Sequence, residues 1–573
     1  MTPKMASSSG ETRAVRKGFV EVDGRLVHYR YAGNGPAVVM LHDSPRSSRL
    51  HRETMARLAD HYRVYALDTP GYGASSPLDA GRPTIAMFSA ALGRTLEAMG
   101  LASAPLYATH TSAKIALDHA ARSGNPPRLI LDGLSIPAGP PDVPFIEAYM
   151  RPFRLDDAGG YLATEWTRMR DMLRWFPWFT PTPAARMPIA GQGDAWIADY
   201  VLDLLSAGPH YSSAYAAAMY YDPMPALRTV RCPTVVAARA DDVLFASLER
   251  VPAHDNDALT VMRLPADGTA WLEWLVGMFA EAPVLPEPPD AKDAAAVYTT
   301  LPHGQMLVRR AGHGLQPLLI LDAPTTLHAR QWQDALGDRP TLVPDLPGYG
   351  GSGPLPVASI EAAADALAAM IDALGLDRVD VLGLGFATPL AAAFAARQGD
   401  RVGRVVLDGC FAVDDAERDA FAAALCPDPG FDRAGGHLHR IWHMLRDGEA
   451  QWPWFDGAPS AQRTLDPLLS AAALHPALVA ILEQPAHYGD IARAAVQCPA
   501  AARYAVFAPP ALILDHPDDP AYRAAGTVAA LLPDARLATR AAHVADTCAI
   551  VCTFLDDAVP HPAGASRTVE NAI

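Results

Sequence analysis

The sequence contains a long internal repeat, and this repeat limits the folds that the chain can adopt. Corresponding segments lie 275 to 277 residues apart: the loop sequence DTPGYGASS at residues 68–76 matches DLPGYGGSG at residues 345–353. The sequences WTRMRD and WHMLRD, which begin at Trp166 and Trp442, match in the same way. Because several different segments share one period, we interpret the chain as a tandem duplication in which each half folds as the same unit.

The length and composition of the chain agree with two globular units. A chain of 573 residues is longer than a single hydrophobic core usually supports. Hydrophobic residues make up 50% and charged residues 19%, which is typical of folded proteins. The formal net charge of −16 argues against a nucleic-acid partner and against an anionic membrane surface. We therefore expect a small-molecule substrate or ligand as the partner.

The sequence further indicates a reduced, cytoplasmic protein. The six cysteines include no C-x-x-C pair, so neither disulfides nor a structural zinc site is expected. No run of 18 apolar residues is present, and the polar N-terminal segment has no apolar signal-peptide core. We expect neither a metal nor an organic cofactor.

Each half alternates short apolar runs with longer helical patterns. PAVVML at residues 36–41 is a continuous apolar run of the kind found in a central parallel strand, and a helical pattern occupies residues 84–99. Such alternation predicts the α/β class, with two mostly parallel sheets that are covered by helices and carry helical caps. The expected boundaries are a disordered tail at 1–17, a first domain at 18–280 with its cap at about 138–231, a Pro-rich linker at 281–295, a second domain at 296–558 with its cap at about 411–508, and a C-terminal tail at 559–573.

A strand, a sharp turn and a helix are predicted at residues 106–117 (LYATHTSAKIAL) and again at residues 381–390 (VLGLGFATPL). Small residues permit a strained turn that exposes one side chain at its tip, where a nucleophile stands in a G-x-S-x-G frame. The tip falls on His110 in the first half and on Gly385 in the second. Neither residue supplies an oxygen or sulfur nucleophile, so the usual chemistry of this turn is absent from both halves.

Both halves resemble the α/β-hydrolase superfamily. The resemblance rests on the D-x-P-G-Y-G loops, the two strand–turn–helix segments, the L-D-G strand ends and the Asp-Asp turns, and it covers nearly the whole chain. A closer resemblance, to an uncharacterised bacterial branch of that superfamily, rests on three segments: LHDSPRSS at residues 41–48, the first strand–turn–helix segment, and WTRMRD at residues 166–171. The resemblance implies two eight-stranded, mostly parallel sheets, each with a helical cap over an active site.

The resemblance also implies where a catalytic triad would stand, and both halves depart from that pattern. The acid position falls on Asp242 in the first half and on Asp519 in the second, and the base position falls on His543 in the second half only. A His543–Asp519 dyad could activate water or remove a substrate proton. His110, near Asp43 and Asp242, is the rival site in the first half.

Further residues are candidates for the two pockets. Asp43 and Asp322 occupy the oxyanion-hole loop, where a carboxylate opposes a developing negative charge unless it is protonated. His210 and His487 recur at equivalent cap positions, and some of the aromatic cap residues are expected to line the pockets. The candidate pocket residues are Asp43, Ser44, Thr111, Asp322, Gly385, Phe386, His210, His487, Trp166 and Trp442.

These observations predict a cofactor-independent enzyme that acts on a small apolar or aromatic ester-like substrate, as a hydrolase or lyase. It would use histidine–carboxylate acid/base chemistry without a nucleophilic serine. The alternatives are a non-catalytic pseudohydrolase that binds a small ligand, and a chain with one active and one regulatory domain. The two domains are expected to pack as an intramolecular pseudo-dimer, and the sequence leaves any higher oligomer open.

Overall fold

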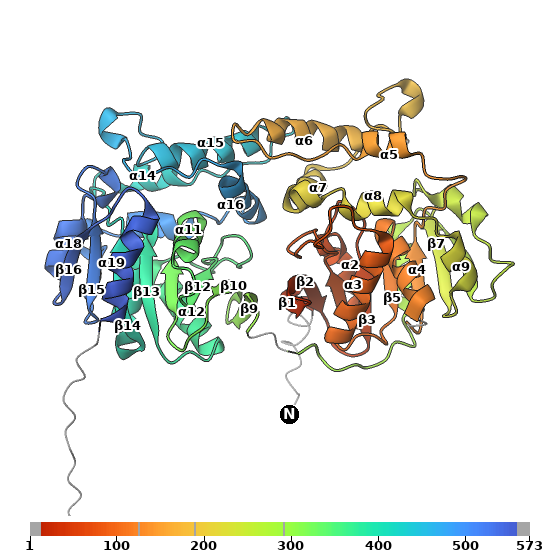
Figure 1. Cartoon of the computed structure of the whole chain (residues 1–573), viewed down its shortest axis with the longest axis horizontal. Helices are drawn as coiled ribbons and strands as arrows, with labels where there is room; N and C mark the ends of the chain where they lie inside the picture. Colours follow the sequence, from red (N-terminus) through yellow and green to blue (C-terminus); the bar gives the residue numbers. More distant parts are fainter. Residues whose placement is uncertain (1–12, 124–125, 188–190, 290–292, 558–573) are drawn as a thin grey trace, which may run out of the picture.

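The computed structural model describes residues 13–123, 126–187, 191–289 and 293–557, which form two α/β units (Figure 1). Each unit contains an eight-stranded sheet, and the strand order of the second sheet is that of the first: β1-β2-β4-β3-β5-β6-β7-β8 corresponds to β9-β10-β12-β11-β13-β14-β15-β16. The first three strands in the spatial order of each sheet pair antiparallel (β1, β2 and β4, and likewise β9, β10 and β12), and the remaining pairs are parallel. The predicted α/β class and the two mostly parallel sheets are confirmed.

The strands have the following bounds. The first sheet contains β1 (Arg16–Val22), β2 (Arg25–Ala32), β3 (Ala37–Leu41), β4 (Arg63–Leu67), β5 (Leu106–Thr109), β6 (Leu129–Asp132), β7 (Thr234–Arg239) and β8 (Leu259–Leu264). The second sheet contains β9 (Ala296–Leu301), β10 (Gly304–Ala311), β11 (Leu318–Leu321), β12 (Thr341–Pro344), β13 (Val379–Leu384), β14 (Val402–Asp408), β15 (Ala511–Asp515) and β16 (Ala535–Thr539).

Helices cover both faces of the first sheet because its central strands are apolar on both sides. Successive side chains of a strand point to opposite faces, so Val38 packs in one core cluster with α2 (Arg52–Leu58) and α10 (Gly268–Met278). Its neighbour Val39 packs in the other cluster, with α3 (Ile85–Ala98) and α4 (Thr111–Ser123). In the second unit, the helices outside the cap are α11 (Leu327–Ala335), α12 (Ile360–Ala373), α13 (Thr388–Gln398), α18 (Ala525–Leu531) and α19 (Val544–Asp556).

A helical cap is inserted after the sixth strand of each sheet. The first cap contains α5 (Val143–Tyr149), α6 (Gly160–Met172), α7 (Asp194–Ala207), α8 (Ser213–Tyr220) and α9 (Met224–Thr229). The second contains α14 (Arg418–Leu425), α15 (Gly436–Ala450), α16 (Ala471–Glu483) and α17 (Asp490–Gln497). The two caps lie side by side, so that α6 and α15 form a continuous layer over both units at the top of Figure 1.

The contact between the caps is reciprocal and requires glycine on both sides. A Cβ atom on Gly159 would lie 2.5 Å from Trp442 Nε1, and a Cβ atom on Gly435 would lie 2.9 Å from Trp166 Cγ. Both glycines have positive φ angles, of 79° and 85°, which other residues rarely adopt. Each glycine thus lets the tryptophan of the other unit approach its backbone at the start of a cap helix.

The two units also meet along their first strands. Lys17 N donates to Gln305 Oε1 at 2.7 Å, and its ammonium group donates to Gly351 O at 2.9 Å. Lys17 had been expected in a disordered tail, but β1 begins at Arg16 because this segment pairs with β2 and contacts the second unit. Residues 1–12 and the whole of the expected C-terminal tail lie outside the described residues.

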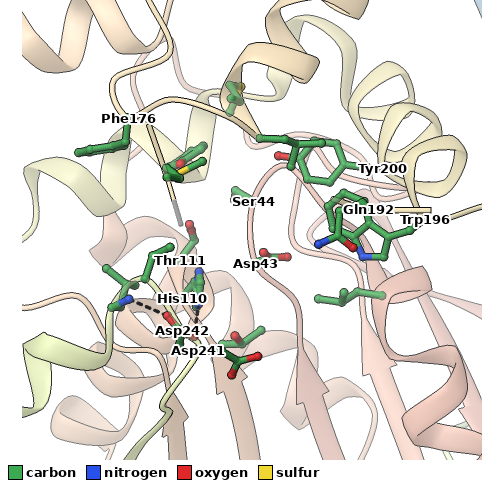
Figure 2. Close-up of a pocket in the computed structure, with 18 of the residues that line it drawn as sticks. Asp43, Ser44, His110, Thr111, Phe176, Gln192, Trp196, Tyr200, Asp241 and Asp242 are labelled. Atoms are coloured by element: carbon green, nitrogen blue, oxygen red, sulfur yellow. Dashed lines mark hydrogen bonds and ion pairs between the residues drawn. The ribbon is translucent and has the colours of Figure 1, made fainter. Parts of the chain in front are cut away.

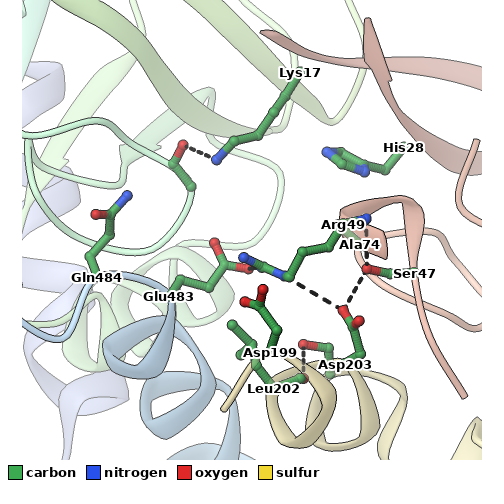
Figure 3. Close-up of polar contacts among 12 residues, drawn as sticks. Lys17, His28, Ser47, Arg49, Ala74, Asp199, Leu202, Asp203, Glu483 and Gln484 are labelled. Carbon is green, nitrogen blue, oxygen red and sulfur yellow. Dashed lines mark hydrogen bonds and ion pairs between the residues drawn. The ribbon is translucent and has the colours of Figure 1, made fainter. Parts of the chain in front are cut away.

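Charged side chains are buried next to this contact (Figure 3). Arg49 Nη2 lies 3.4 Å from Glu483 Oε1, so a residue of the first sheet unit pairs with the last residue of α16 in the second cap. Burial would raise the pKa of Glu483, but the charges of Arg49 and Lys17 outweigh it and hold that pKa below its usual value. The carboxylate of Glu483 therefore balances cations from the first unit.

The six cysteines are free thiols. Within the described ranges, no helix has both the length and the apolar character needed to cross a membrane.

Candidate functional site

The two strand–turn–helix segments have nearly the same backbone geometry. His110 stands between β5 and α4 with a φ angle of 49°, and Gly385 follows β13 with a φ angle of 48°. A left-handed conformation is unusual for histidine and indicates a backbone that its surroundings hold in place. Both units therefore have the same left-handed turn, although only the first has a side chain at its tip.

His110 forms a direct pair with the predicted acid of the first unit. His110 Nε2 lies 2.9 Å from Asp242 Oδ2, and Asp242 Oδ1 accepts a hydrogen bond from Leu244 N at 2.7 Å. Asp242 stands in the turn after β7, three residues beyond the end of that strand. Gly133 leaves room for the imidazole ring, because a Cβ atom there would lie 2.5 Å from His110 Cδ2. The structure thus joins two candidates that are 132 residues apart in sequence.

The carboxylates around His110 determine its charge. Burial alone would lower the pKa of the imidazole, but the hydrogen bond to Asp242 and the charges of Asp242, Asp43 and Asp132 raise it to about 9. The same pair lowers the pKa of Asp242 against the effect of burial. His110 is therefore an imidazolium at neutral pH, and Nδ1 is the ring nitrogen that remains for a ligand.

Asp43 faces the same pocket from the loop after β3 (Figure 2). Its Oδ1 atom is buried and has no hydrogen-bond partner among the described residues, and burial raises the pKa of the carboxyl group. The neighbouring His42 holds this loop, because its Nδ1 donates to Asp43 O at 2.7 Å and its Nε2 accepts from Thr69 N at 2.9 Å. Asp43 is thus a carboxyl group with one oxygen free of described hydrogen bonds, beside the imidazolium of His110.

His110 and Asp43 lie at the floor of a cavity of about 1160 Å³, the first pocket. The predicted residues Ser44, Thr111 and Trp166 line it as well. Two further lining residues, Phe431 and Arg433, come from the cap of the second unit. Aromatic cap residues supply much of the wall, as Figure 2 shows for Phe176, Trp196 and Tyr200. The first pocket is therefore completed by both units.

Sequence reasoning missed a second histidine of the first pocket. His51 is buried, and its Nε2 atom has no hydrogen-bond partner within the described part of the chain. Burial lowers its pKa to about 3, so the ring is neutral. No motif marks His51, because it stands at the start of a helix that the fold alone brings to the pocket.

The prediction of a His543–Asp519 dyad is wrong. His543 is 56% exposed and lies 3.4 Å from Asp466, whereas Asp519 is buried, pairs with Arg463 and caps a short helix. Arg540, three residues before His543, is buried and its Nε donates to Asp408 Oδ2 at 3.2 Å, and both residues line the same cavity as Gly385. The buried Arg540–Asp408 pair thus replaces a histidine that faces the turn.

The second unit has a much smaller cavity, of about 160 Å³, to which the predicted residues Asp322, Gly385 and Phe386 contribute. His328 Nε2 lies 3.0 Å from Glu449 Oε1 at its edge, a pair that joins α11 to α15. Burial raises the pKa of Asp322 to about 6. No local motif marks the His328–Glu449 pair, because its members are far apart in the chain.

Three other predicted pocket residues have structural positions instead. A Cβ atom on Gly71 would lie 3.2 Å from His210 Cβ, and one on Gly348 would lie 3.0 Å from His487 Cβ. The two histidines therefore pack on the D-x-P-G-Y-G loops, and neither is among the described residues that line the two pockets. Trp442 packs on Gly159 between the caps. No group of three or more histidine, cysteine, aspartate or glutamate side chains that could hold a metal ion is found among the described residues.

Comparisons with known proteins agree with this fold. A family model described as the alpha/beta hydrolase fold matches residues 326–424, in the second unit. A pimeloyl-[acyl-carrier protein] methyl ester esterase from Vibrio vulnificus (strain YJ016) is 35% identical over 54 residues, which are 9% of this chain and only 21% of the esterase.

Similar solved structures each match about half of the chain. A laboratory-evolved variant of potato epoxide hydrolase is 18% identical, with a TM-score of 0.39, over 47% of this chain and 98% of its own. Epoxide hydrolase A from Mycobacterium thermoresistibile (19% identity, TM-score 0.37) covers 47% of this chain and 100% of its own. A thermophilic esterase from Thermogutta terrifontis is 19% identical, with a TM-score of 0.35, over 47% of this chain and 97% of its own.

The family match and the shared strand order of the two sheets give one conclusion. The chain contains two α/β units of the same strand order in tandem, and residues 326–424 of the second unit match the alpha/beta hydrolase fold. Because a fold of this kind hosts many chemistries, the site residues have to carry the functional argument.

Proposed function

We propose that the first pocket is the active site of an enzyme that hydrolyses an ester or lactone with an apolar or aromatic body, by acid/base catalysis and without an acyl-enzyme. The observation that carries the proposal is the His110–Asp242 pair on the strained turn, beside the Asp43 carboxyl group, whose buried Oδ1 atom has no described hydrogen-bond partner. Enzymes often pair two titratable groups and use their surroundings to make one an acid and the other a base. Here the surroundings raise the pKa of His110, which stays protonated, and burial raises the pKa of the Asp43 carboxyl group.

His110 is the acid of this mechanism. Its imidazolium, held by Asp242, presents the proton on Nδ1 to the substrate carbonyl oxygen and gives it up as the tetrahedral intermediate forms. A conventional oxyanion hole would use backbone N–H groups at this point, but the carboxyl group of Asp43 occupies the oxyanion-hole loop. A charged imidazolium at the tip of the turn supplies the missing stabilisation of negative charge.

Asp43 is the base. A carboxylate whose pKa is raised by burial is better matched to proton transfer near neutral pH than an exposed one. Asp43 accepts a proton from water while the water oxygen bonds to the carbonyl carbon. It returns that proton to the leaving alkoxide when the intermediate collapses, while one hydroxyl group of the intermediate gives its proton back to His110 Nδ1 as the carbonyl group forms again. The carboxylic acid and the alcohol then leave, with Asp43 again a carboxylate and His110 again an imidazolium.

The absence of a nucleophile at either turn favours a second candidate, a pseudohydrolase that binds its ligand in the first pocket without turnover. One experiment separates the two functions. A panel of aryl esters and activated lactones is offered to the wild type, His110→Gln, Asp43→Asn and the exposed control His543→Gln, at equal folded concentration. The proposed enzyme is supported if His110→Gln and Asp43→Asn each reduce the rate of hydrolysis by about 10²-fold or more. The control His543→Gln should leave that rate unchanged. No turnover with any ester would overturn the proposed enzyme.

A further inference from the structure

The first pocket has its acidic side chains at the floor only, where Lys114, Arg239 and His110 also line it. The lining aspartates, Asp43, Asp132, Asp241 and Asp242, all stand at the carboxyl ends of strands or in the loops that follow them. In contrast, the described cap residues that line the pocket include four arginines and no acidic residue. In a chain with a net charge of −16, a pocket roof whose charged side chains are all arginines is a distinctive feature.

The four arginines come from three segments that the cap fold brings together. Arg170 is one helical turn beyond Trp166 on α6, so both reach the same face of that helix. Arg174 follows the helix, and Arg186 lies opposite it, because residues 175 and 186 form an antiparallel bridge and Met187 N donates to Arg174 O at 2.9 Å.

The fourth arginine belongs to the other unit. Arg433 precedes α15 in the second cap, and its backbone carbonyl accepts a hydrogen bond from the Arg170 guanidinium. Its own guanidinium lies 2.5 Å from Asp194 Oδ1 at the start of α7. Phe431 of the same segment packs against Trp166, with ring centroids 5.9 Å apart. The second unit thus fixes both an aromatic wall and a cation at the mouth of the first pocket.

We infer that the cap arginines Arg170, Arg174, Arg186 and Arg433 form a subsite for an oxyanion at the far end of the substrate, a carboxylate or a phosphate. This inference rests on the proposed function, which places the reacting carbonyl group at His110. Planar guanidinium groups bind both oxyanions through paired hydrogen bonds. Arg239 and His110 of the floor are already paired with Asp241 and Asp242, so the carboxylates still disfavour a second negative charge near Asp43. The anionic end is therefore directed to the cap and the neutral carbonyl group to the floor. The second unit, which lacks a side chain at its own turn, then serves the first by supplying Arg433.

Two matched pairs of compounds test this subsite. The first pair is mono-(4-nitrophenyl) glutarate, with a carboxylate tail, and 4-nitrophenyl pentanoate, a neutral ester of equal chain length. A third ester of that length with a phosphate tail distinguishes the two oxyanions. The second pair is the corresponding anilides, whose binding is measured by calorimetry without turnover. The variants are Arg170→Gln, Arg433→Gln and the double variant Arg174→Gln/Arg186→Gln, with Arg418→Gln as a control in the second cap.

We expect the wild type to prefer an anionic ester over the neutral one by about tenfold or more in kcat/KM, mainly through KM. Each variant should reduce this preference threefold or more, rising salt should weaken it, and Arg418→Gln should leave it unchanged. The variants alter exposed or half-buried side chains, and Arg174 and Arg186 make no described contact with the second unit, so at least one variant keeps the fold.

The outcomes separate the inference from the proposed function. Equal turnover of neutral and anionic esters, unaffected by the arginine variants, would overturn the subsite while leaving the active site standing. In another outcome, calorimetry shows that the wild type binds an anionic anilide, the arginine variants do not, and no ester is turned over. This outcome would support the subsite and overturn the proposed hydrolysis. No preference for an anion in either assay overturns the subsite.

Discussion

Replacing Asp242 by asparagine should change the pH dependence of the enzyme more than its structure. The asparagine Oδ1 atom can still accept the hydrogen bond from Leu244 N, so the turn after β7 keeps its support. Its amide group cannot stabilise an imidazolium, and it removes both the hydrogen bond and the charge that raise the pKa of His110. Burial then acts without this opposition, and the pKa of His110 falls.

The size of this effect follows from the two pKa values. With a pKa of about 9, His110 is about 97% protonated at pH 7.5, whereas with a pKa at the ordinary value of about 6.5 it is about 9% protonated. If the imidazolium is the acid, the rate at pH 7.5 falls roughly tenfold. At pH 5.5 both forms of the enzyme are mostly protonated, so their rates should agree within about twofold. The fall in rate at alkaline pH moves from about 9 to 6.5 or below.

The assay is kcat/KM for one activated ester between pH 5 and 10, measured for the wild type and Asp242→Asn. An NMR titration of ¹³C-labelled histidine, with the His110 signal identified by its loss in His110→Gln, gives the pKa of the ring directly. A variant whose alkaline limb stays near pH 9, or one that loses activity equally at every pH, would refute the reasoning. The second result would mean that Asp242 only positions the ring.

Three further predictions follow from other parts of the structure. Gly435→Ala should lower the free energy of unfolding by about 1–3 kcal/mol in denaturant titrations, because its Cβ would lie 2.9 Å from Trp166, whereas the control Gly457→Ala has open space and should have a far smaller effect. Glu483→Gln should destabilise the contact between the units at pH 7 by about 1–2 kcal/mol, since Arg49 loses one of its two carboxylate partners and keeps only Asp203 of its own unit. The pKa of Glu483 is lowered in the folded chain, so its contribution is present above the unfolded pKa and is lost as the pH falls through the folded value; calorimetry should show no difference between variant and wild type at low pH. His543→Ala should change the unfolding free energy by less than about 0.5 kcal/mol, because the side chain is 56% exposed; a larger loss would indicate a role that the structure lacks.

The repeat and the hydrophobic pattern were sufficient to predict the fold. Periodicity indicates strands and helices locally, and the fixed spacing between the loops at 68–76 and 345–353 extended the argument to both halves. The tip residue His110 and its partner Asp242 could be identified because both belong to short local patterns. Such patterns are set by backbone geometry, which sequence reveals well.

Contacts between distant segments were not predictable in the same way. Equivalent spacing placed His543 at a base position, but nothing local shows that Arg540 pairs with the buried Asp408. The reciprocal packing of the caps, which brings Arg433 into the first pocket, depends on the relative orientation of the two units. Sequence patterns describe each unit by itself, so they contain no information on that orientation.

The most direct test of the central claim is a single turnover of an activated ester by excess enzyme in H₂¹⁸O, quenched and analysed by mass spectrometry. The account predicts one ¹⁸O atom in the carboxylic acid product and a protein of unchanged mass at every time point, because water attacks the substrate without a covalent intermediate. A protein that carries the acyl group, on Asp43, Ser44, Thr111 or any other residue, or a product acid without ¹⁸O, would contradict it.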